Sequence, residues 1–214
     1  MRIRRFITNP YQENSYLLIG SGGMAWIIDP GFYTASERRL LQNFLQAEKV
    51  QLVGIYLTHT HIDHILGVRW LVEEYHLPVY YHANEEPVYA HAAQWAQMMG
   101  LAYEPGPPAT AYLQGTETLY LDSEPIQVFF VPGHSPGHVA FYAAESRNLL
   151  SGDVLFRGSI GNYELPLADY NTLMHSLEGL FLRLPDDVTV WPGHGEPTTI
   201  GYERVHNPFL ASRL

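Results

Sequence analysis

Apolar and polar positions alternate along the chain in patterns that predict both strands and helices. Two apolar runs separated by a Ser-Gly-Gly turn at 21–23 are typical of a β-hairpin over 15–31. Apolar side chains three and four residues apart predict helices over 35–48, 85–99 and 170–184. In the second of these helices they form a stripe that we interpret as core packing: Val88, Ala92, Trp95 and Met99.

The second half of the chain consists mainly of short β-like runs. They follow a Pro-rich segment over 104–110, which cannot form regular structure and which we expect at a rim. A last strand over 188–194 precedes a short helix that starts near Thr199. Two halves that each form a sheet, with helices outside, predict an α/β fold with four layers.

The stretch over 50–64 carries the first chemical signal. An apolar, β-branched run predicts a buried strand, and it ends in four side chains that can bind metal ions: His59, His61, Asp63 and His64. In an extended segment, residues i and i+2 point to the same side, so His59 and His61 can reach one ion together. A turn must direct Asp63 and His64 toward a different point. The stretch therefore predicts a metal site at the end of a strand.

Three later strands end in the same types of side chain, within Gly- and Pro-rich loops. These residues are His134, Asp153 and His194. Each of them alone would more often be an ordinary loop residue than a ligand. Together with the first four they supply five His and two Asp, which is enough to hold two ions and to leave a coordination position open.

Composition limits the alternatives. With 214 residues, 46% of them hydrophobic, the chain fits a single domain over 1–214. The absence of Cys excludes disulfides and thiolate ligands. A net charge of −10 argues against a nucleic-acid partner. Neither a signal peptide nor a membrane-spanning run is visible, so we expect a cytoplasmic protein without membrane contact, and its apolar content is compatible with a homodimer.

The chain resembles the metallo-β-lactamase superfamily in four segments, which occur in the order THTHIDH, PGHSPGH, SGDVLF and PGHGEPTT. It is most similar to the glyoxalase II-like, single-domain metal-dependent hydrolases of that superfamily. The resemblance covers nearly the whole chain, from Asp29 to residues 207–209. It implies a four-layer αββα sandwich with a dinuclear metal site along one edge.

Carried over residue by residue, the resemblance implies one metal held by His59, His61 and His134 and a second held by Asp63, His64 and His194. Asp153 would bridge both ions. Oxygen and nitrogen ligands suit zinc, which we expect, as well as iron or manganese. Asp29 would support the ligand loop from behind. The alternative is that Asp29 is a turn residue before Pro30 without such a contact.

The reaction follows from such a centre. Two cations would lower the pKa of a bridging water to about 7, so that hydroxide attacks an electrophilic carbonyl carbon at neutral pH. Asp63 could orient this nucleophile or shuttle its proton. We therefore expect a small-molecule acyl substrate, in the first place a thioester, as in hydroxyacylglutathione hydrolases.

The residues that grip glutathione in the family are missing. Its Lys and Tyr, in the loop after the bridging Asp, fall at Asn162 and Glu164. The single Lys of the chain, Lys49, stands ten residues before His59 at the far end of a strand. We therefore predict Arg157 as the substrate anchor and Tyr163 as a pocket residue, with a salt bridge and ordinary packing as the respective alternatives.

Other functions use related centres. A persulfide dioxygenase would carry one iron held by two His and one Asp, and the PGHGEP segment favours hydrolysis over this reaction. Hydrolysis of lactones or other esters remains open. Asp153 weakens a β-lactamase interpretation, since those enzymes usually have a non-carboxylate residue there.

Overall fold

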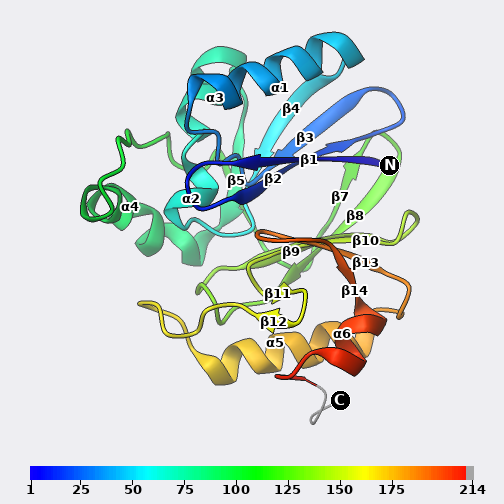
Figure 1. The fold of residues 1–214 in the computed structure, drawn as a ribbon. Coiled ribbons are helices and arrows are strands. Elements are labelled where there is room, and N and C mark those ends of the chain that lie inside the picture. The colour runs from blue at the N-terminus through cyan, green and yellow to red at the C-terminus, as the bar shows by residue number, and fades with distance from the viewer. Residues whose placement is uncertain (211–214) are drawn as a thin grey trace.

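The structure is a computed structural model that describes residues 1–210, and its strands form two six-stranded sheets (Figure 1). The first sheet has the strand order β1-β2-β3-β4-β5-β6. Its strands are β1 (Arg2–Thr8), β2 (Glu13–Ile19), β3 (Met24–Ile28), β4 (Gln51–Tyr56), β5 (Val79–His82) and β6 (Ala111–Leu113). The predicted hairpin is confirmed, because β2 and β3 pair in antiparallel orientation.

The second sheet has the order β14-β13-β10-β9-β8-β7. Its strands are β7 (Thr118–Leu121), β8 (Glu124–Phe130), β9 (Val139–Ala143), β10 (Asn148–Gly152), β13 (Thr189–Pro192) and β14 (Thr198–Thr199). A separate two-stranded hairpin consists of β11 (Leu155–Phe156) and β12 (Ser159–Ile160). The segment that follows it reaches the site described below.

Helices cover the outer faces of both sheets and give the fold its four layers (Figure 1). The first sheet is covered by α1 (Ala35–Glu48) and α3 (Val68–Tyr75), and the second by α5 (Tyr170–Arg183) and α6 (Ile200–His206). The remaining helices are α2 (Ile62–Ile65), a 3-10 turn (Ala83–Glu85) and α4 (Glu86–Met98). The predicted αββα architecture is confirmed.

The part of the chain that the structure describes forms three hydrophobic clusters in this sandwich. One packs α1 and α3 on the first sheet, one lies between the sheets, and one packs α5 and α6 on the second sheet. The cluster between the sheets draws on alternate residues of β2 and β3, among them Tyr16, Leu18, Trp26 and Ile28. All seven residues of β2 are buried, since this strand has neighbours on both faces. Among residues 1–210, no helix combines the length and apolar character that crossing a membrane requires.

Backbone hydrogen bonds join the two sheets at the edge where several strands end. The amide of Val139 donates to Thr58 O (2.8 Å), and that of Asn14 donates to Gly193 O (2.7 Å). The amide of Gly193 donates to Gly152 O (2.8 Å). The first two bonds tie the loops after β4 and β13 to strands of the opposite sheet, and the third ties the loop after β13 to the end of β10. These loops, together with the one after β8, carry the residues of the site.

Candidate metal centre

The first group of ligands combines the loop after β4 with the loop after β8. His59 and His61 lie on the extended segment between β4 and α2, and His134 lies between β8 and β9. One ligand atom from each of the three residues lies within 4.8 Å of the others. His61 Nδ1 and His134 Nε2 are 2.9 Å apart. The i, i+2 spacing thus turns both loop histidines toward one point, together with a third from the second sheet.

The second group forms where the chain turns into α2. Asp63 and His64 belong to the first turn of this helix, and His194 follows β13. Asp63 Oδ2 lies 3.1 Å from His194 Nε2 and 3.6 Å from His64 Nε2. The helical turn directs Asp63 and His64 toward His194, so the six residues form two triads. The triads adjoin, because the ring centroids of His59 and His64 are 4.2 Å apart, and these two histidines also form a candidate group with Asp29.

Asp153, directly after β10, lies between the triads. Its Oδ1 is 3.5 Å from His64 Nε2, and its Oδ2 is 3.6 Å from His194 Nε2 and 3.7 Å from His134 Nε2. One carboxylate therefore faces both groups. The structure brings together all seven residues that the sequence marks as ligands.

Contacts behind the histidines orient their rings. His134 Nδ1 donates to Asn162 O (2.8 Å), and His194 Nδ1 donates to Tyr11 O (3.2 Å). Because a carbonyl oxygen can only accept, these contacts place the proton on Nδ1 and leave the Nε2 lone pair free to bind a metal. His59 Nδ1 lies 3.0 Å from Thr58 Oγ1, so its Nε2 also faces the centre.

Asp29 lies behind His64. Its Oδ2 is 3.2 Å from His64 Nδ1, and its two oxygens also accept hydrogen bonds from the Thr58 amide (2.7 Å) and hydroxyl (2.6 Å). A second carboxylate, Glu13, approaches the same histidine nitrogen to 3.9 Å and is completely buried. Sequence reasoning identified Asp29 and missed Glu13, which belongs to a strand that lies far from the ligand loop in sequence.

Unpartnered polar atoms show that the centre fits metal ions. His59 Nε2, His64 Nε2 and Asp153 Oδ1 are buried without any hydrogen-bond partner among residues 1–210. Burial of such atoms is costly, and two cations, one in each triad, would satisfy all three. A Cβ at Gly193 would clash with the carboxylate of Asp153, so glycine is needed here for the loop to approach the centre. Two divalent ions, one per triad with Asp153 shared, fit this donor set.

Electrostatics favours the ligating form of His59, His61 and Asp153. Burial lowers the pKa of His64 and of His194, but the neighbouring carboxylates outweigh it and raise both values. Burial, followed by the neighbouring His134, lowers the pKa of His61 to about 3, and burial also lowers the pKa of His59 well below its usual range. Burial by itself raises the pKa of Asp153, but the charges of His64 and His194 outweigh it and leave this pKa below its ordinary value. Neutral imidazole and ionised carboxylate are the forms that bind metals.

Glu85, which no sequence pattern singles out, joins the two ligand loops. It is fully buried at the start of α4. Its Oε2 accepts hydrogen bonds from the Thr60 amide (2.8 Å) and hydroxyl (3.0 Å), both in the loop after β4. Its Oε1 accepts from the Ser135 hydroxyl and the Gly137 amide, each at 2.6 Å, in the loop of His134. Burial raises the pKa of Glu85, against the effect of these donors.

His138 is a second buried residue that supports the centre. Its ring stacks on that of His59 with centroids 4.7 Å apart, and its Nε2 accepts a hydrogen bond from the Asp153 amide (3.1 Å). Gly152 leaves room for this packing, because a Cβ there would clash with Thr58 and His138, and its φ of 50° is left-handed. The PGHSPGH segment thus provides one candidate ligand, His134, and one residue, His138, that packs against another candidate ligand.

A cavity of about 500 Å³ opens over the centre. Five of the seven ligand residues line it, together with Tyr11, Ile62, Trp95, Met99, Phe156, Asn162, Leu165 and Pro166. This corrects the interpretation of the α4 stripe as core packing. Val88 and Ala92 are buried in the core, whereas Trp95 and Met99 face the cavity, since α4 projects beyond the edge of the first sheet.

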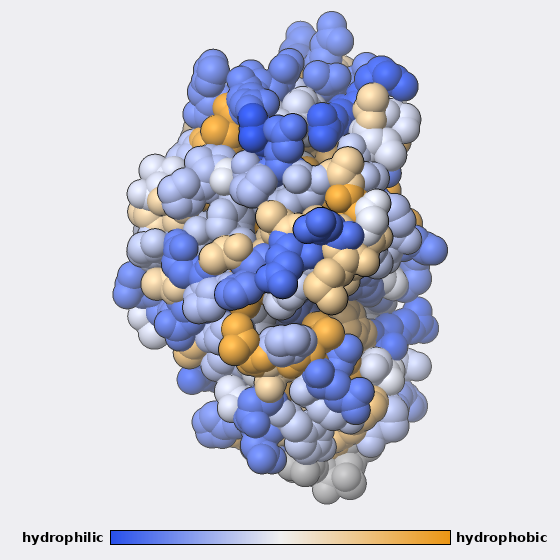
Figure 2. Space-filling model, turned by 90° about the vertical axis from the view of Figure 1, so that its left-hand side faces the viewer, coloured by the Kyte–Doolittle hydropathy of each residue, from blue (hydrophilic) through white to orange (hydrophobic). Residues whose placement is uncertain are grey.

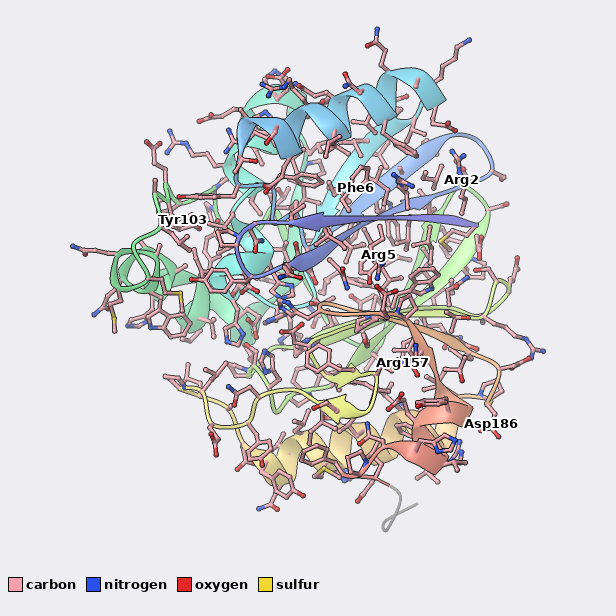
Figure 3. All side chains as sticks on the ribbon, viewed as in Figure 1. Arg2, Arg5, Phe6, Tyr103, Arg157 and Asp186 are labelled. Carbon is pink, nitrogen blue, oxygen red and sulfur yellow. The ribbon has the colours of Figure 1, made fainter. Side chains whose placement is uncertain are left out.

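Arg157 and Tyr163, predicted as substrate contacts, do not line this cavity. Arg157 occupies the turn of the β11–β12 hairpin, where its side chain points toward α6 and away from α4 (Figure 3). Its guanidinium lies over the ring of Tyr202, 5.4 Å from the centroid. Tyr163 contacts Tyr170 edge-on (4.8 Å) and packs on the cluster beneath the second sheet. The neighbouring residue Asn162 lines the cavity instead. Tyr163 packs against the second sheet, so its side chain does not reach the cavity.

Comparison with known proteins agrees with this geometry. The family model of the metallo-β-lactamase superfamily matches residues 8–194. Hydroxyacylglutathione hydrolase GloC of Haemophilus influenzae is 34% identical over the full length of both chains. The crystal structure of TTHA1623 in a di-iron-bound form is 42% identical, with a TM-score of 0.87 over 97% of this chain and 100% of that one.

A further solved structure, BLEG-1 B3 metallo-β-lactamase, is 35% identical, with a TM-score of 0.88 over 98% of this chain and 99% of the other. The family model covers more than half of the chain, and the relatives match nearly all of it. Together with two ligand triads at the expected strand ends, these matches identify the fold and the class of the protein: the chain belongs to the metallo-β-lactamase superfamily of metal-dependent hydrolases.

Proposed function

We propose that the protein is a dinuclear metal-dependent hydrolase that cleaves activated acyl compounds, in the first place thioesters. The observation that carries this proposal is the pair of ligand triads that share Asp153 and open into one cavity. If only one ion were bound, the other triad would keep its buried polar atoms without a partner.

When bound, two divalent ions supply a water molecule that ionises near neutral pH and an electrophile for the carbonyl oxygen of the substrate. The residues of the chain hold these ions and exclude bulk water. Asp63 lines the cavity, so its carboxylate can orient the attacking water and accept its proton. We propose zinc, and the di-iron form of TTHA1623 supports iron as the alternative.

The name of GloC supports a thioester as the substrate. In this reaction the water oxygen bonds to the carbonyl carbon, the C–S bond breaks, and its electron pair leaves with sulfur, which takes up a proton. The products are a carboxylic acid and a thiol. No nucleophile from the protein is required.

Hydrolysis of a β-lactam is a second candidate, favoured by the similarity to BLEG-1. It needs the same attack on a carbonyl carbon, with a ring nitrogen in place of sulfur as the leaving group. Lactones could react at the same centre. A persulfide dioxygenase with one iron would use only part of the ligand set.

The test combines metal analysis with a panel of substrates. We expect two metal ions per chain and hydrolysis of S-lactoylglutathione or other thioesters at rates above those for lactones and β-lactams. His194→Ala should lose one metal equivalent and most of the activity. His175→Ala, an exposed histidine on α5, is the matched control and should lose neither. One iron per chain with oxygen uptake on glutathione persulfide would overturn the proposal.

A further inference from the structure

The cavity over the metal centre has a polar floor and an apolar wall. The floor consists of the ligand side chains. The wall on one side comes from α4, where the ring of Trp95 lies 6.0 Å from that of His61 and Met99 lies one helical turn further. Leu165 and Pro166, in the segment before α5, line the cavity as well. A substrate that reaches the metals therefore also contacts apolar side chains.

Apolar surface continues outside the cavity. Met99 is 53% exposed, and Leu167, next to two lining residues, is 58% exposed with a φ of 68°. Figure 2 views the side on which α4 and the segment before α5 lie in Figure 1, and hydrophobic atoms gather below the middle of that face. An exposed apolar surface next to an active centre is typical of a ligand-binding groove.

No cationic side chain is available to an anionic substrate group at this wall. Within residues 1–210, none of the residues that line the cavity is Arg or Lys. Arg157 lies over the ring of Tyr202. Arg5 donates to Gly195 O, next to His194, and forms an ion pair with Glu196 at 3.1 Å. A carboxylate placed between Trp95 and Leu165 would lose its hydration without gaining a partner.

We propose that the site selects acyl substrates whose acyl group is uncharged and apolar, and that this group lies against Trp95 and Met99. The inference rests on the proposed thioesterase function and specifies its substrate class. Met99 suits such a role, since a flexible thioether side chain adapts to acyl groups of different shape.

The test compares thioesters of one neutral thiol, N-acetylcysteamine, with the metal-loaded protein. The acyl groups are butanoyl, hexanoyl and adipoyl, of which the last matches hexanoyl in length but ends in a carboxylate. We expect kcat/KM to rise by up to about fourfold for each added methylene, which corresponds to about 0.8 kcal/mol. The kcat/KM for the adipoyl thioester should be at least about tenfold lower than that for the hexanoyl thioester, because the adipoyl carboxylate has no partner in the cavity.

Two matched variants locate the preference. Met99→Lys adds a cation to the cavity and should raise the ratio of adipoyl to hexanoyl kcat/KM by about twofold to fivefold. Met98→Lys adds the same charge on the adjacent residue, which is 77% exposed and does not line the cavity, so it should leave the ratio unchanged. An equal effect of both variants would overturn the assignment to Met99.

The experiment distinguishes a wrong substrate class from a wrong thioesterase proposal. If thioesters react but adipoyl equals or exceeds hexanoyl, the apolar preference is refuted and the activity stands. If no thioester reacts, calorimetric binding of 1-hexanethiol and 6-mercaptohexanoate to the metal-loaded protein tests the wall directly. Tighter binding of the uncharged thiol supports the inference, and equal or weaker binding overturns it.

Discussion

Replacement of Glu85 by Gln tests whether this buried carboxylate joins the two ligand loops. In the native protein four donors point at its two oxygens, two from Thr60 and one each from Ser135 and Gly137. Glutamine has the same shape, but one of its terminal atoms is an NH₂ group, which donates. Whichever way the amide is oriented, one backbone N–H and one hydroxyl lose their acceptor.

The size of the stability loss depends on whether each of the two donors can find another hydrogen-bond partner. A hydroxyl can rotate and accept a hydrogen bond from the new NH₂ group, whereas the backbone N–H is fixed and becomes a buried donor without a partner. Such a group costs about 1–3 kcal/mol. Burial raises the pKa of Glu85, so the amide also relieves part of the cost of a buried charge. We therefore expect Glu85→Gln to lower the free energy of unfolding by no more than about 1–3 kcal/mol.

Urea unfolding of the metal-free protein measures this loss, and competition with a chromophoric chelator measures metal affinity. We expect affinity to fall about 10- to 100-fold, because the loops that carry His61 and His134 are no longer held together. Glu86→Gln is the matched control. Glu86 accepts from the hydroxyls of Tyr81 and Tyr112 through one oxygen, which the amide retains. Unchanged stability and affinity in Glu85→Gln would refute the reasoning.

Three further predictions concern the centre and its surroundings. Asp29→Asn should weaken binding of the metal held by His64 about 10- to 100-fold, and unchanged stoichiometry at limiting metal would contradict the role of Asp29 in orienting that ring. Arg157→Ala should leave KM for any substrate unchanged and lower the free energy of unfolding by about 0.5–1 kcal/mol through loss of the Tyr202 contact; a raised KM would return Arg157 to the binding site. Protein with free metal at a thousandfold excess over Kd is the reference for the effect of a chelator. Relative to it, removal of metal should lower the free energy of unfolding by about 4 kcal/mol and the Tm by about 8–16 °C. Added zinc should reverse this shift, and a Tm insensitive to metal would contradict a bound centre.

The sequence alone determined several of the elements and the seven candidate ligands. Helix α1 was predictable to the residue because its signals are local: an apolar stripe and a capping box between Thr34 and Glu37. The seven ligand residues were recognisable because each follows a strand, and the pairing of His59 with His61 depends only on extended backbone geometry.

Contacts between distant segments were decided by tertiary structure. Glu85 looks in sequence like an ordinary residue at the start of a helix, and its four donors come from two loops that follow strands of different sheets. The α4 stripe gives no sign that its last turn projects beyond the sheet, where Trp95 and Met99 become cavity walls. Arg157 is near a ligand in sequence, yet its hairpin turns it toward Tyr202. Periodicity fixes which side of an element a residue occupies, whereas what lies opposite that side depends on packing against the rest of the chain.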